Sequence, residues 1–283
     1  MWTTTLILMG TTATGCVAEP SITELDLPEQ NIEQWTLPLD AYMPPWDDVT
    51  RSDYARNIVM AECLNERGYD VEPPWRDVNN STRRAHINPV GRQLFTEELA
   101  SEHAYGRATN TFENIEEQQV YSEGLNNVDD STWTSCVQVE NERLPLIQNV
   151  GFEATELAAQ ASSQAVQDAA VIEARDTWRE CMLDVGLPDL PRTPEEMPPA
   201  SLGDARDGAV DDIADPREIE VATQDFTCRV SSGYRDALYE VEWDLQVDSL
   251  RDNIVELELA RSTLESNRDV VNEALGLTSD EQG

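Results

Sequence analysis

Five cysteines are the residues of this chain whose positions point most directly to chemistry. Cys16 follows a short apolar start and closes the run Ala13-Thr14-Gly15-Cys16, which looks like a bacterial lipobox. In such a motif the chain is cut before the cysteine, and a diacylglyceryl group is attached to its sulfur. We therefore predict that residues 1–15 are a lipoprotein signal peptide and that lipid on Cys16 anchors the protein outside the cytoplasm, at the outer face of the cell membrane. The alternative is a free or buried cysteine, because residues 1–15 contain no basic residue and Ala13 stands where Leu is usual.

The other four cysteines are even in number and can all pair. Disulfides persist in oxidising compartments outside the cytosol, so paired cysteines agree with an exported protein. Four cysteines allow three connectivities. A redox role is the competing interpretation, but there is no C-x-x-C motif and no Lys or His beside a cysteine to lower the pKa of a thiol. The four are Cys63, Cys136, Cys181 and Cys228.

An internal repeat relates these cysteines to each other. Residues 62–68 and 180–186 both read E-C-x4-G, and in each the glycine can end a helix in the left-handed conformation, with the cysteine in the last turn. The predicted helical stretches are 52–67 and 152–185. A second matched pair of sites ends at Cys136 and Cys228, each with a hydroxyl residue before the cysteine. A duplication would give the sequential pairs Cys63 to Cys136 and Cys181 to Cys228, while the other connectivities remain open.

The composition excludes several classes of site. The formal net charge is −37, and all 19 basic residues are arginine. Without lysine the usual Walker A loop and the Schiff-base cofactor site cannot form. His86 and His103 are the only histidines, which excludes a His-rich metal site. The acidic excess argues against binding to nucleic acid, which requires a basic face. We expect no metal, no cofactor and no catalytic residue.

One segment has a local excess of arginine. Between Pro74 and Phe95 the only acid is Asp77. Arginine binds carboxylate or phosphate with two parallel hydrogen bonds and stacks on aromatic rings, so this segment is the candidate ligand or partner site. The alternative is that these arginines pair with the protein's own many acids. The candidate binding residues are Arg76, Arg83, Arg84, His86 and Arg92.

The elements that must position these residues are mainly α-helical. Residues 16–48 contain eight acids, no basic residue and five prolines, which predicts an acidic tether, although the aromatic stretch 35–42 can instead dock on the domain. The first cysteine-paired unit is expected at 49–150 and the second at 151–283. Long helices are predicted over 151–185 and 234–275. The second has a heptad-like apolar stripe, which predicts an intramolecular hairpin or bundle seam, or alternatively a partner-binding coiled coil.

Together these features resemble uncharacterised secreted lipoproteins of actinobacteria. The resemblance rests on the lipobox at Cys16, the 35–42 stretch, the E-C-x4-G helix ends and the runs 88–92 (Asn-Pro-Val-Gly-Arg) and 103–106 (His-Ala-Tyr-Gly). It implies export, lipidation and disulfides, and it implies no particular activity.

The sequence thus favours a non-catalytic binding or scaffold protein of the cell envelope. Its partners would be the membrane, through the lipid on Cys16, and an envelope protein or an anionic ligand at the arginine-rich segment. The alternative function is a hydrolase of envelope glycan that uses two carboxylates, which requires a cleft holding both acids with the pKa of one raised. The sequence leaves the oligomeric state open.

Overall fold

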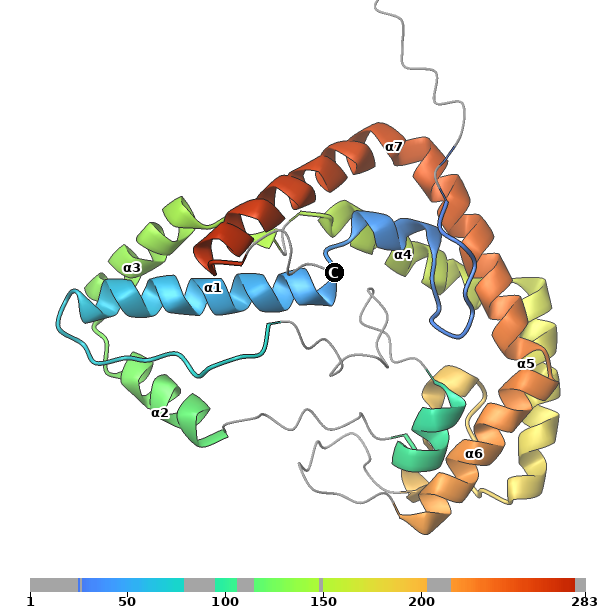
Figure 1. Cartoon of the computed structure of the whole chain (residues 1–283). Coiled ribbons are helices and arrows are strands. Elements are labelled where there is room, and N and C mark those ends of the chain that lie inside the picture. Colours follow the sequence, from blue (N-terminus) through green and yellow to red (C-terminus); the bar gives the residue numbers. More distant parts are fainter. Residues whose placement is uncertain are drawn as a thin grey trace, which may run out of the picture.

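Long helices form an open frame in the computed structural model of the chain (Figure 1), which describes residues 25, 27–78, 95–105, 115–147, 150–202 and 215–277. These ranges are mainly helical, as expected, and contain no β-strand. The longest helix, α7 (Tyr234–Ala274), bends near its middle and forms two sides of this frame, and shorter helices pack on both of its halves. Two disulfides tie the shorter helices together in pairs.

The first pair of helices is α1 (Trp46–Asn65) and α3 (Asp130–Arg143), joined by a disulfide between Cys63 and Cys136. After α1 the chain turns at Gly68, whose φ of 94° lies in the left-handed region expected for this glycine. Asp129 begins α3 by accepting hydrogen bonds from the backbone N–H groups of Ser131 and Thr132. Helix α2 (Ile115–Asn126) precedes α3, and its Tyr121 packs in the core around this disulfide.

The second pair is α5 (Ala169–Met182) and α6 (Pro216–Ser231), joined by the disulfide between Cys181 and Cys228. Both bridges therefore follow the sequential pairing that the repeat favours. They close 73 and 47 residues of chain, so each contributes roughly 4 kcal/mol in the chain-entropy model. Gly186 has a φ of 73°, again the left-handed conformation expected at this position.

The prediction of one continuous helix over 152–185 is wrong. Helix α4 (Phe152–Ala165) ends before Asp168, whose backbone is extended and whose side chain accepts a hydrogen bond from the N–H of Ala170 to start α5. An aspartate whose side chain binds a nearby backbone N–H in this way competes with continuation of the helix. The alanine-rich sequence on both sides favours helix, and for this reason the break was not predicted. Short 3-10 turns follow at η5 (Leu183–Val185), η6 (Pro194–Glu196) and η7 (Ala200–Leu202).

Helix α7 confirms the predicted C-terminal helix, and its apolar stripe is an intramolecular seam. Buried residues recur every seven positions, and they pack on α1, on α4 and on the chain before α1, while Tyr234 and Leu238 of the same helix pack on α5. The helix bends at Asn253 (φ −121°, ψ 17°), whose side-chain amide donates to the Ser249 carbonyl at 2.8 Å. Arg268 of α7 forms an ion pair at 2.7 Å with the buried Asp48 of α1. The recurring residues are Trp243, Leu250, Leu257, Leu264 and Val271.

Residues 31–43, here called the strap, dock on α7. They include the 3-10 helix η1 (Pro38–Tyr42), and Leu37 and Leu39 are 0% exposed. The Leu39 N–H donates to Gln246 Oε1 at 3.0 Å, and the Trp35 indole donates to Glu242 Oε2 at 3.1 Å. Docking is thus the outcome for the 35–42 stretch, because its apolar side chains and backbone groups find partners on α7. Residues 16–24 of the expected tether lie outside the described residues.

Candidate functional site

The arginine-rich segment can be located only in part. Arg76 is partly buried and makes no hydrogen bond or ion pair within the part of the chain that the structure describes, and the neighbouring Trp75 is 60% exposed. The grouping of these side chains into one face remains a prediction, because the other candidates, Arg83, Arg84, His86 and Arg92, lie in the range 79–94 outside the described residues. Phe95, at the end of this segment, is described and leads to a different site.

The anchoring residue cannot be located either. Cys16 and the expected signal peptide precede the described residues. Over the ranges that the structure describes, no helix is both long and apolar enough to span a bilayer.

A cavity of about 350 Å³ lies where the strap meets the end of α6 and the start of α7. Phe95 and Tyr105, which flank the π-helical turn η3 (Leu99–His103), and the turn η6 complete its walls. This volume falls in the usual range for sites that bind small molecules. Among the described residues, its lining includes five aromatic side chains, Trp35, Phe95, Tyr105, Phe226 and Tyr234, and four charged ones, Glu33, Glu195, Arg229 and Arg235.

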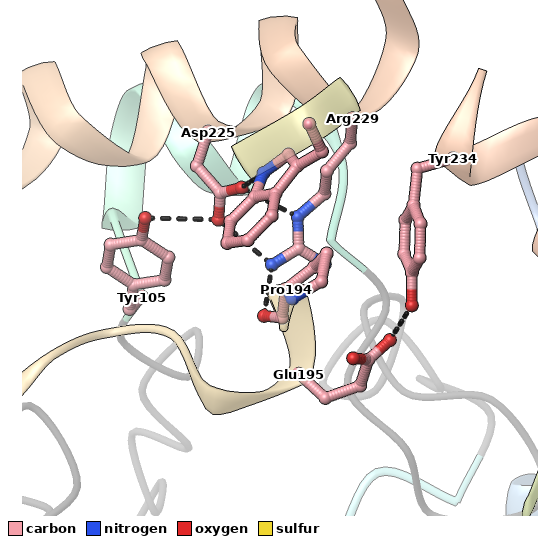
Figure 2. A network of polar contacts seen from close by, with 7 residues as sticks. Tyr105, Pro194, Glu195, Asp225, Arg229 and Tyr234 are labelled. Atoms are coloured by element: carbon pink, nitrogen blue, oxygen red, sulfur yellow. Dashed lines mark hydrogen bonds and ion pairs between the residues drawn. The ribbon is translucent and has the colours of Figure 1, made fainter. Parts of the chain in front are cut away.

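Asp225 of α6 organises one wall of this cavity (Figure 2). Its carboxylate is 0% exposed, and Arg229 binds it with two hydrogen bonds of 2.9 Å from Nε and Nη2. The Trp178 indole donates to it at 2.8 Å and the Tyr105 hydroxyl at 3.1 Å. The four contacts match the four acceptor positions of an ionised carboxylate, so the buried charge is fully bonded. Burial and the nearby Asp225 charge both raise the pKa of Tyr105, which therefore remains a donor.

Arg229 is held in the cavity wall by more than this ion pair. Its Nη2 also donates to the Pro194 carbonyl at 2.6 Å, and its guanidinium lies 4.5 Å from the centre of the Phe95 ring. Phe95 in turn stacks on Tyr105 at 5.4 Å between ring centres. Burial alone would lower the pKa of Arg229, but the charge and hydrogen bonds of Asp225 outweigh it and the net shift is upward. The arginine is a fixed cation.

Arg235, in the first turn of α7, bonds differently. Its Nη1 and Nη2 donate to the two carboxylate oxygens of Glu33 at 3.1 and 2.9 Å, and Nη2 also donates to the Ile32 carbonyl at 3.1 Å. The Arg235 side chain is 13% exposed, whereas that of Glu33 is 72% exposed. Hydrogen bonding to Arg235 lowers the pKa of Glu33. The Tyr234 hydroxyl, also in the cavity lining, donates to Glu195 (Figure 2).

Three described carboxyl groups have a raised pKa, and they lie outside the cavity lining. Burial raises the pKa of Asp40 to about 7, and it also raises those of Glu140 and Glu218. None of the three lines the cavity, and the pKa of Glu33, which does, is lowered. Among the described residues no group of three or more His, Cys, Asp or Glu side chains is placed to hold a metal ion.

Sequence reasoning missed Arg229 and Arg235, the arginines that line this cavity among the described residues. A signal was present for Arg229, because Asp225 precedes it by four positions and such pairs meet on one face of a helix. For Arg235 there was none, because its partner Glu33 is 202 positions away in the chain. Comparison with known protein families, with characterised proteins and with solved structures gives no match for this chain.

Proposed function

We propose that this protein is a non-catalytic binding protein of the cell envelope and that the cavity is its ligand site. The observation that carries the proposal is a pocket of about 350 Å³ whose aromatic walls surround two arginines held in place by ion pairs. Binding sites for small molecules combine a mostly apolar lining with a few fixed polar groups in this way. The arginine-rich segment enters this proposal only through Phe95, at its end.

The location outside the cytoplasm is part of the same proposal. Two disulfides support it, because such bonds persist in oxidising compartments. Lipidation of Cys16 would anchor the protein at the outer face of the membrane, in the manner of the lipoproteins that the sequence resembles. We expect the intact mass of protein extracted from native membranes to show loss of residues 1–15 and a diacylglyceryl adduct on Cys16. A chain that keeps Met1 and has unmodified Cys16 would contradict the anchor.

Ligand capacity can be tested with a neutral aromatic probe. We expect 1-N-phenylnaphthylamine, whose fluorescence rises in apolar surroundings, to bind the chain from Cys16 onward at one saturable site. Leu238 lines the cavity, and Leu238→Trp places a larger side chain in the space that the probe would occupy. We expect this change to weaken binding by about tenfold or more. Fluorescence titration gives both dissociation constants.

The matched control is Leu259→Trp on the same helix, at a side chain that is 70% exposed and lies outside the cavity. It should bind the probe as the unchanged protein does. Thr96→Trp blocks the same cavity from a partly exposed position, and it serves if Leu238→Trp does not fold. Equal probe affinity in the unchanged protein and in a folded cavity-filling variant would refute the proposed site.

A further inference from the structure

The two arginines of the cavity differ in how firmly they are bound to their acidic partners. Arg229 is paired with Asp225, which is 0% exposed and bonded on all sides. Arg235 is paired with Glu33, a side chain that is 72% exposed at the turn of the strap. The ion pair of Arg229 is therefore buried, whereas that of Arg235 has a solvent-exposed carboxylate.

Another carboxylate can replace that of Glu33 as the partner of Arg235. An ion pair with a largely exposed partner contributes little to stability, because water solvates the carboxylate almost as well as arginine does. If Glu33 swings outward, Arg235 remains held by the Ile32 carbonyl at 3.1 Å and by the Phe226 ring, whose centre is 5.8 Å away. Nη1 and Nη2 of Arg235 are then available to a second carboxylate, and their spacing matches that of its two oxygens.

The surroundings of that position favour an anion with an apolar body. Arg235 is the second residue of α7, where the helix dipole stabilises negative charge. Trp35, Phe226 and Leu238 supply apolar wall beside it. The net charge of −37 opposes an incoming anion from a distance, but at physiological ionic strength this repulsion is screened over about 8 Å and the local pair dominates.

We propose that the cavity binds a small organic acid with an aromatic or branched apolar body, whose carboxylate replaces that of Glu33 on Arg235. This inference rests on the proposed function and specifies the ligand class for the same cavity. Glu33 is then an internal competitor that occupies the guanidinium in the empty protein. If the ion pair only fastened the strap to α7, Arg235 would give no preference for an acid over its amide.

The experiment compares 4-phenylbutyrate with 4-phenylbutyramide, which share a body and differ in charge, by isothermal titration calorimetry at physiological salt. We expect the acid to bind about tenfold more tightly than the amide, the effect of one charge-assisted pair of hydrogen bonds. Glu33→Ala removes the competitor and should tighten binding of the acid while leaving that of the amide unchanged. Arg235→Met should abolish the preference for the acid.

Arg251→Met is the matched control, because Arg251 pairs with Asp248 on the same helix and lies outside the cavity. It should keep the preference for the acid. Equal affinity for acid and amide, or a preference that survives Arg235→Met, would overturn this inference while the proposed function stands if the neutral probe binds. Failure of the neutral probe to bind would instead remove the proposed function itself.

Discussion

Replacing Asp225 with Asn is expected to lower the free energy of unfolding by about 3 to 5 kcal/mol, the usual cost of removing one partner from a buried ion pair. Arg229, only 17% exposed, would keep its charge and lose the carboxylate that neutralises it. The amide group can accept hydrogen bonds only through its one oxygen, so donors among Trp178, Tyr105 and Arg229 would lose their acceptor. Urea unfolding followed by circular dichroism measures the change.

Two further variants separate charge burial from a general loss of packing. Asp248→Asn removes a carboxylate that is 71% exposed and should change stability by less than about 0.5 kcal/mol. Replacing both members of the buried pair, with Asp225→Leu and Arg229→Met together, should recover about half of the loss, because no unpaired charge is then left inside. A single Asn variant that unfolds as the unchanged protein does would show that Asp225 does not organise this wall.

The unfolding free energy is expected to fall as pH rises from about 4 to about 7, because the folded protein must give up the proton that it holds on Asp40 in the strap. Burial raises the pKa of this side chain from 3.8 to about 7, and the nearby charge of Glu242 adds to the effect, although the Leu37 N–H opposes it. Between these two values the folded protein holds a proton that the unfolded chain has released. The stabilisation is therefore complete below about pH 4 and is lost as pH rises toward 7, by an amount on the order of 3 kcal/mol.

The contribution of Asp40 is isolated by subtraction, because Glu140 and Glu218 also have raised pKa values and add to the total pH dependence. Asp40→Asn keeps an oxygen to accept from the Leu37 N–H, which the Asp40 carboxylate binds at 2.9 Å, but cannot ionise. Its stability relative to the unchanged protein should therefore increase between pH 4 and 7. Asp252→Asn, at an exposed position on α7, should show no such difference. Parallel curves for Asp40→Asn and the unchanged protein would contradict the assignment.

Local sequence rules were sufficient for much of the fold. Gly68 and Gly186 take the left-handed conformation that the E-C-x4-G pattern predicts, and the disulfides follow the pairing that a duplication favours. The long C-terminal helix and its seven-residue repeat of buried side chains were readable because both depend on residues within a few turns of each other. The break at Asp168 also had a local cause, the capping side chain of this aspartate. It was not predicted because the residues on both sides favour helix.

The cavity depended on the tertiary structure alone. Its ion pair between Glu33 and Arg235 spans 202 positions, and the contact of Arg229 with the Pro194 carbonyl spans 35. Such contacts form only after the strap docks on α7 and after the helices of the second pair meet, which no periodicity within one segment predicts. Sequence determined which residues form helices and which cysteines match. Packing between distant segments decided which of the many acids and arginines became buried partners, because burial, neighbouring charges and hydrogen bonds together shift the pKa of each group.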